Sequence, residues 1–335
     1  MAKKNVYNNF YDKESWNDVS TQNKLLLEDF MLELKQRKRA DSTIAQYTND
    51  LRIVFIFILR KLENKYILDL TKRDFRKYSL YLIEECEVSS ARHNRLMSAA
   101  RSLLNYAEEE DDYEYENNVA RKVRGLSKEP VREIFFLTDE EVMRLKNELI
   151  KRNEYQKATL LMLAYDSAGR KAEIGQVIKD SFYDISKSNT NKVIGKRRKT
   201  FSLIYFSGTK ECAKMWLDQR GEDDIESLWL TEIGGIKKPA KDSNLYDWFV
   251  SMRQIFFELE GVEKEFNVHS MRHTSLQNFA MGSHYVCEEL NMEEGFPIEK
   301  LRLLANHENV DTTQGYLKDT SLDVLEDMFG IKIET

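Results

Sequence analysis

The sequence predicts a mainly helical protein with two domains and one small β-hairpin. Its 335 residues exceed what one small domain needs, and the hydrophobic fraction of 41% supplies apolar material for two cores. Glycine (13 residues) and proline (3 residues) are scarce, so few strands and tight turns are expected. Helical spacing of apolar residues dominates both halves of the chain, and one basic turn between two apolar runs stands apart.

The first half contains four segments with an apolar helical face. In the first of them Leu27, Phe30 and Leu34 share one side, and Asp41-Ser42-Thr43 suits an N-cap for the second. The four expected helices cover about residues 22–38, 44–58, 72–85 and 90–107. The following stretch is polar, weakly periodic and carries Gly125 and Pro130, which predicts a linker.

A second series of helices follows the linker. Thr138 and Glu141 form the pattern of a capping box, and residues 157–165 are apolar on all sides, as in a buried helix. Apolar runs at 192–194 and 201–206 flank a basic turn and predict a hairpin. Further helices are expected near 208–218, 243–259, 270–281 and 297–305. The predicted order is a tail at 1–21, a helical domain at 22–117, a linker at 118–134, a second domain at 135–318 and a terminal helix or tail at 319–335.

Composition favours a cytoplasmic protein without metal. No apolar run reaches the roughly 20 residues of a membrane span, and the N-terminus lacks the apolar stretch of a signal peptide. Cys86, Cys212 and Cys287 are far apart and odd in number, so we expect reduced thiols rather than a disulfide framework or a zinc site. The net charge of −6 argues mildly against a nucleic-acid partner, although the first 128 residues carry a slight basic excess.

Three groups of residues have the chemistry of phosphoryl transfer. His269, Arg272 and His273 share a face at helical spacing and can converge on one anion. Arg170 follows Gly169 at an expected helix start, where free N–H groups favour anions. Tyr316 follows His307 by nine residues. Such a reaction needs cationic donors, an in-line nucleophile and an acid for the leaving oxygen.

This ordered set resembles the catalytic signature of tyrosine recombinases of the phage integrase type. The matching elements are Arg170 with Glu173, Lys196 after Ile-Gly, the H-x-x-R-H box at 269–273, and His307 before Tyr316. The first half is similar to the family's helical, SAM-like core-binding domain, and Leu137 to Val142 resembles the opening of its α+β catalytic domain. The resemblance covers about residues 22–328, and its catalytic motifs are far more specific than its N-terminal ones.

The resemblance implies a role for each matching residue. Arg170 and Arg272 would hold the scissile phosphate, and Tyr316 would attack it to form a 3′-phosphotyrosine. Lys196, with Lys199 as a competitor, would protonate the leaving 5′ oxygen. His269 would assist proton transfer at the tyrosine and His307 would donate to a phosphate oxygen, with Glu173 and His273 in support. The ester keeps the bond energy, so neither ATP nor metal is expected.

Three departures from the family pattern affect the residues around this set. Ala305-Asn306-His307 replaces the usual Leu-Gly-His, and Ser167-Ala168-Gly169 replaces the usual Thr-Gly before the first arginine. Arg197-Arg198 occupy the hairpin where a glycine is common. None of these changes removes a reactive group.

The implied partner is double-stranded DNA with inverted-repeat core sites, bound by a homotetramer on two sites, with a possible accessory DNA-bending or excision factor and no membrane. The terminal segment would dock on a neighbouring subunit. Candidate DNA contacts are basic or polar side chains of the first half, the linker and the hairpin: Ser42, Thr43, Arg92, Arg95, Arg101, Arg121, Lys122, Arg124, Arg197 and Arg198. Each of the basic ones could equally be a solvated surface charge.

Several functions remain open at this point. Integration, excision or inversion of a mobile element is the leading interpretation, and Xer-like dimer resolution is an alternative within the same class. A DNA-binding regulator that no longer cleaves would be expected to have lost part of the catalytic set. A type IB topoisomerase or telomere resolvase uses similar chemistry, but the compact two-domain length favours a recombinase.

Overall fold

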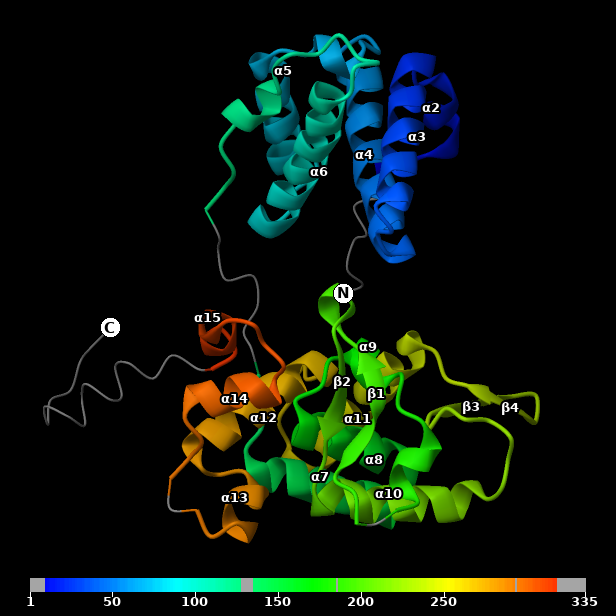
Figure 1. The fold of residues 1–335 in the computed structure, drawn as a ribbon, viewed down its shortest axis with the longest axis vertical. Coiled ribbons are helices and arrows are strands. Elements are labelled where there is room, and N and C mark those ends of the chain that lie inside the picture. Colours follow the sequence, from blue (N-terminus) through cyan, green and yellow to red (C-terminus); the bar gives the residue numbers. More distant parts are fainter. Residues whose placement is uncertain (1–9, 128–134, 185, 293, 318–335) are drawn as a thin grey trace, which may run out of the picture. The chain divides into compact units, whose positions relative to one another are not determined.

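The chain forms two compact units, Met1–Glu133 and Ile134–Thr335, which we call unit 1 and unit 2 (Figure 1). The computed structural model describes residues 10–127, 135–184, 186–292 and 294–317. Both units are mainly helical, as the composition predicts. Each is considered by itself below.

Unit 1 is a bundle of helices around one apolar core. Side chains of Ser20, Thr71 and Ser89 cap three of its helices, and Thr71 forms a capping box with Asp74. The predicted cap at residues 41–43 is wrong, because Ala40 is the N-cap residue and Asp41 begins the helix. The elements are α2 (Lys13–Asp18), α3 (Thr21–Gln36), α4 (Asp41–Lys61), η1 (Ile67–Asp69), α5 (Lys72–Leu80), the π-turn η2 (Tyr81–Glu85), α6 (Ser90–Glu109) and η3 (Val119–Lys122).

Two expected irregular segments are built into unit 1. Residues 1–21 were expected as a tail, but α2 forms there and Trp16 packs near Phe55, with ring centroids 6.3 Å apart. The first part of the expected linker also packs on the unit, since Ala120 and Val123 are buried in its core. The composition of these segments is mainly polar and did not indicate that they pack on the unit. One or two apolar side chains in each are enough to attach it to the core.

Helix α8 (Tyr155–Ser167) is the centre of unit 2. Residues Ala158 to Ser167 are all buried, as the apolar run in the sequence predicts. Its neighbours are α7 (Asp139–Lys151), α10 (Ser207–Arg220), α11 (Asp242–Glu260) and α12 (Val268–Met281). The remaining elements are α9 (Lys171–Ile174), η4 (Lys179–Phe182), α13 (Tyr285–Glu289), α14 (Ile298–Leu304) and α15 (Val310–Gln314).

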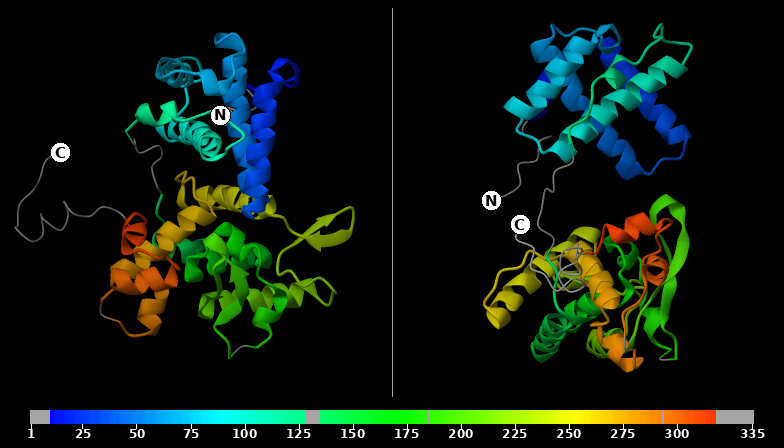
Figure 2. Two further views of the ribbon diagram at one scale, coloured as in Figure 1. Left: turned by 45° about the horizontal axis from the view of Figure 1, so that its top comes forward. Right: turned by 90° about the vertical axis from the view of Figure 1, so that its left-hand side faces the viewer.

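The described residues of unit 2 form two antiparallel hairpins, of which the sequence predicted one. The predicted hairpin is β1 (Asn189–Ile194) paired with β2 (Thr200–Ile204), and its tip contains the turn η5 (Lys196–Arg198). The second, β3 (Leu230–Ile233) with β4 (Ile236–Pro239), extends away from the helices (Figures 1 and 2). Gly234 and Gly235 form its turn at φ +61° and +78°, backbone angles that glycine adopts without strain.

The expected terminal helix at 319–335 lies outside the described residues. Within the described part of the chain, no helix is long and apolar enough to span a bilayer. The three cysteines are free and buried, as expected for reduced thiols.

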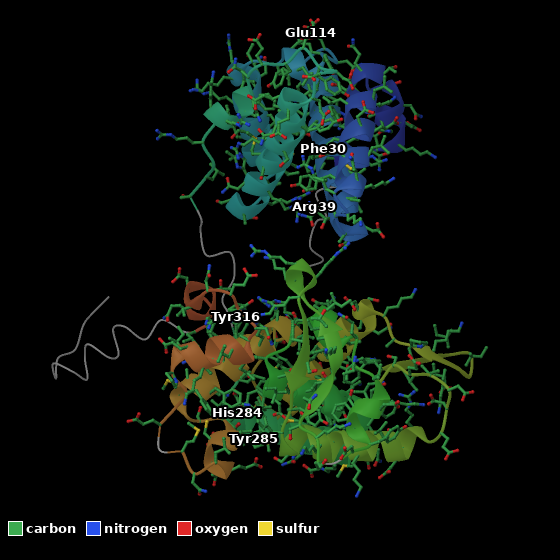
Figure 3. All side chains as sticks on the ribbon, viewed as in Figure 1. Phe30, Arg39, Glu114, His284, Tyr285 and Tyr316 are labelled. Carbon is green, nitrogen blue, oxygen red and sulfur yellow. The ribbon has the colours of Figure 1, made fainter. Side chains whose placement is uncertain are left out.

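A buried polar network joins the helices on the side of unit 2 away from Tyr316 (Figure 3). Asp166 accepts hydrogen bonds from Thr209 Oγ1 (2.6 Å) and the Tyr285 hydroxyl (2.8 Å). Burial raises the pKa of Asp166 to about 6. His284 is stacked on Phe279, with ring centroids 3.7 Å apart, and burial lowers the pKa of His284 to about 3. The shifts of Asp166 and His284 therefore change the stability of unit 2 in opposite directions as pH falls.

Acidification should destabilise unit 2 partly through His284. The unfolded chain binds a proton at its ordinary pKa of 6.5, so the contribution of His284 is complete above pH 6.5 and is lost as pH falls toward 3. Between pH 7 and pH 5 this loss is about 2 kcal/mol. Between pH 7 and pH 5, the free energy of unfolding of His284→Gln should therefore fall by about 2 kcal/mol less than that of the wild type. Denaturant unfolding followed by the tryptophans Trp216, Trp229 and Trp248 of unit 2 measures it.

Asp166→Asn is the matched control with the opposite sign. The raised pKa of Asp166 contributes stability at low pH that is lost as pH rises through about 6. Removing this group should make the acid-induced loss steeper, whereas removing His284 makes it shallower. Parallel pH curves for the wild type and His284→Gln would contradict the assignment.

Candidate active site

Arg272 is the centre of the candidate site. It lies on α12, and its side chain is almost fully buried, with 1% of the residue exposed. Its Nη1 donates to the carbonyl oxygen of Ala168, and its Nη2 donates to that of Ala305 (2.7 Å). These two residues are the C-caps of α8 and α14. Two helix C-termini, which carry partial negative charge, therefore hold the guanidinium in place.

Two of the three departures from the family pattern lie at these two helix ends. Ala168 adopts φ 48° and Asn306 adopts φ 51°, both in the left-handed region. Asparagine tolerates this region better than other non-glycine residues, so Asn306 can take the place of the family's glycine. In this chain the carbonyls of Ala168 and Ala305 accept from Arg272 although Ala168 and Asn306 stand where the family pattern has glycine.

His307 is buried against Arg272. Its Nε2 accepts a hydrogen bond from Arg272 Nη2 (2.6 Å), and its Nδ1 lies 3.0 Å from Thr313 Oγ1. Burial, followed by the charges of Arg272 and Arg170, lowers the pKa of His307 to about 3. The imidazole is therefore neutral at physiological pH.

Tyr316 lies among three histidine rings and Arg272. Its ring centroid is 4.4 Å from that of His273, 5.1 Å from His307 and 5.5 Å from His269, and Arg272 Cζ lies 5.0 Å from it. His273 Nδ1 donates to the Tyr316 carbonyl (3.0 Å), which fixes the backbone at this residue. Burial lowers the pKa of both His269 and His273, so both favour the neutral form that can accept a proton.

Arg170 is fixed by Glu173, as expected of a supporting carboxylate. Arg170 is the N-cap of α9, its backbone N–H donates to Glu173 Oε2 (2.8 Å), and its Nη1 pairs with Oε1 (2.9 Å). The β1–β2 hairpin approaches closely here. A Cβ on Gly195 would lie 3.0 Å from Glu173 Oε1 and 2.6 Å from the Phe201 ring, so a larger residue here would have to displace these side chains.

The hairpin tip and the His307 loop form one pocket. It is lined by Arg170, Lys196, Lys199, His307 and their neighbours. Both candidate lysines are exposed at its wall, so their competition for the acid role stays open. Arg197 forms an ion pair with Glu308, and this contact links the hairpin to the loop before α15. The pocket is therefore mainly basic.

The arginines of α6 that were predicted to contact DNA differ in whether their side chains are already bound within unit 1. Arg92 and Arg95 both pair with the buried Asp50, at 2.6 and 3.1 Å, and Arg95 keeps half of its side chain exposed. Arg101 is directed inward and donates to the carbonyls of Ala120 (3.1 Å) and Val123 (2.7 Å). These two bonds hold the segment after α6, and a role of Arg101 in DNA contact stays a prediction.

The remaining predicted contacts are at the surface. Arg121 pairs with Glu108 (2.7 Å), and Arg198 is exposed at the hairpin tip of unit 2. Ser42 lies in the exposed first turn of α4, with Thr43 half-buried beside it, and Lys122 and Arg124 are exposed after α6. These residues remain candidates.

Sequence reasoning missed Thr313, Glu308 and Asp50. Thr313 contacts His307, Glu308 pairs with Arg197, and Asp50 pairs with Arg92. None of the three is part of the catalytic motifs, so nothing in the sequence singled them out. The spacing of six residues between His307 and Thr313 gives no signal by itself, because the contact depends on the loop between them.

The chain belongs to the phage integrase family, whose model matches residues 136–322. It is a tyrosine-type site-specific recombinase. A curated relative, the SPbeta prophage-derived recombinase-like protein YomM of Bacillus subtilis (strain 168), is 26% identical over 312 residues, which cover 89% of this chain and 87% of the relative.

Solved structures share the fold at low identity. A lambda integrase dimer bound to a COC′ core site has a TM-score of 0.63 and 14% identity, covering 88% of this chain and 95% of the other. The XerH recombinase in a post-cleavage complex with a palindromic difH substrate has a TM-score of 0.63 and 13% identity, covering 91% and 84%. The mainly helical fold predicted from the sequence is confirmed.

Proposed function

We propose that this recombinase cleaves and rejoins DNA through Tyr316 and moves a mobile element by integration, excision or inversion. The observation that carries the proposal is the convergence of Arg272, His307 and Tyr316 beside the basic pocket of Arg170 and Lys196. The prophage origin of the curated relative supports the assignment to a mobile element.

Each step follows from the chemistry of these side chains. The Tyr316 oxygen attacks phosphorus, and the bond from phosphorus to the 5′ oxygen breaks. His269 takes the phenol proton and Lys196 protonates the leaving oxygen. Arg170 and Arg272 stabilise the charge on the non-bridging oxygens. The 3′-phosphotyrosine keeps the ester bond energy, so a 5′-hydroxyl from a second strand can attack its phosphorus, join the strands and release the Tyr316 oxygen.

Arg272 retains a donor for this task. Its Nε is buried and has no hydrogen-bond partner among the described residues. An unsatisfied buried donor costs roughly 1–3 kcal/mol, and an arriving phosphate oxygen would satisfy it. Burial lowers the pKa of Arg272 to about 10, which still leaves the guanidinium charged at pH 7.

We also propose that the substrate is double-stranded DNA with inverted-repeat core sites, bound by four copies on two sites through a Holliday junction. The lambda integrase neighbours support this: one is bound to a core site and another is a tetramer on a Holliday junction. The exposed Arg95 and the basic hairpin tip would contact backbone phosphates. The reaction would take place on cytoplasmic, nucleoid-associated DNA.

Covalent trapping tests the proposed function. The protein is incubated with a nicked duplex taken from the ends of the element that encodes it, and the products are separated under denaturing conditions. We expect a protein–DNA adduct joined at a 3′ phosphate, with a free 5′-hydroxyl on the released strand. Specific binding without an adduct would instead indicate a non-cleaving DNA-binding protein, and relaxation of supercoiled DNA without any site would indicate a topoisomerase.

A further inference from the structure

Both ring nitrogens of His307 are engaged, and this determines where its proton lies. A guanidinium nitrogen can only donate, so Nε2 accepts the 2.6 Å hydrogen bond from Arg272 Nη2. The proton of the neutral ring is therefore on Nδ1, which donates to Thr313 Oγ1 at 3.0 Å. His307 is 4% exposed and Thr313 is fully buried, so solvent does not compete for these bonds.

This tautomer cannot perform the role proposed for His307. Donation to a phosphate oxygen requires a proton on Nε2, the nitrogen that faces Arg272. A switch of tautomer needs a partner for Nδ1 that can both accept and donate. A threonine hydroxyl can do both, because its hydrogen rotates about the Cβ–Oγ1 bond.

We propose that Thr313 is the positioning residue that sets the tautomer of His307. Its hydroxyl accepts from Nδ1–H while the site is empty. When a phosphate takes Nη2 of Arg272, the hydroxyl rotates and donates to Nδ1, and Nε2–H points at the phosphate. As the site opens to admit the phosphate, Nε2 gains one proton from water and Nδ1 loses one to water, so His307 is neutral both before and after the change. The proposal rests on the proposed function, because it assumes that His307 faces the scissile phosphate.

The location of Thr313 suits this role. It lies on α15, three residues before Tyr316, and the Tyr316 backbone N–H donates to the Thr313 carbonyl (2.9 Å). The same residue therefore contacts the histidine through its side chain and the tyrosine through its backbone. A change confined to the side chain leaves the backbone contact in place.

Nitrogen NMR tests the tautomer directly. The chain has five histidines, so ¹⁵N-labelled imidazoles can be assigned one by one. We expect His307 to be protonated at Nδ1 in the free protein. In the complex of Tyr316→Phe with a core-site duplex, which cannot become covalent, we expect protonation at Nε2. An unchanged tautomer on DNA binding would overturn the proposal, and this measurement does not depend on any change at Thr313.

Two variants then test Thr313 itself by the rate of adduct formation. Thr313→Val keeps the shape and removes the hydroxyl, so cleavage should slow roughly 10- to 100-fold, as when a histidine loses the partner of its second nitrogen. Thr313→Ser keeps the hydroxyl and should stay within about threefold of the wild type, because the hydrogen bond to Nδ1 is preserved. Wild-type cleavage by a folded Thr313→Val would overturn the proposal. Failure of the wild type to form any adduct would instead overturn the proposed function, which separates the two results.

Discussion

Tyr316→Phe should abolish the covalent adduct, with a loss of at least about 10⁴-fold in cleavage rate. Phenylalanine keeps the ring that packs between His273 and His307, at 4.4 and 5.1 Å, and removes only the oxygen that would attack phosphorus. Folding and DNA binding should therefore be retained. Single-turnover incubation with the nicked duplex, followed by denaturing electrophoresis, measures the loss.

Tyr183→Phe is the matched control, because Tyr183 is a strongly exposed tyrosine of the same unit and lies outside the basic pocket. Its adduct should form at the wild-type rate. An adduct with Tyr316→Phe would show that another residue is the nucleophile, and mapping of the labelled peptide would identify it.

Arg272→Lys should slow cleavage at least about 1,000-fold, although the positive charge is kept. The guanidinium reaches the carbonyls of Ala168 and Ala305 and the ring of His307 at once. An ammonium group is compact and cannot span these acceptors while it also contacts a phosphate. The rate of adduct formation at saturating protein separates this effect from weaker binding.

Arg144→Lys serves as the control for this change. Arg144 pairs with Glu260 on the surface of unit 2, and its side chain is half exposed. We expect no more than about a twofold change in rate, because exposed ion pairs contribute little. A rate for Arg272→Lys within tenfold of the wild type would contradict the central role given to the guanidinium.

The sequence predicted the features that depend on local pattern. The buried helix around Leu160 followed from its apolar run, and the order of Arg170, Arg272, His307 and Tyr316 was sufficient to assemble the candidate site. Helical spacing is a property of neighbouring residues, so it can be read locally. The catalytic set spans distant segments and was found through its resemblance to a known family.

Other features depended on packing between distant segments. Arg95 and Arg101 lie on the same helix, yet one is half exposed and the other is held inward by carbonyls about twenty residues later. The β3–β4 hairpin has an almost entirely exposed second strand, so it shows no alternation of apolar and polar residues, and only Gly234-Gly235 indicated it. Neither feature follows from the spacing of residue types.

The ion pair between Arg197 and Glu308 has a consequence for the way DNA binding depends on salt. If Arg197 binds a DNA phosphate, as proposed, the phosphate would displace the Glu308 carboxylate, which stays attached to the chain. The freed Glu308 would attract a cation, which would offset one of the cations that the DNA releases. The protein would thus carry its own counterion, and the net release of ions at this contact would be smaller than the number of basic residues around the pocket suggests.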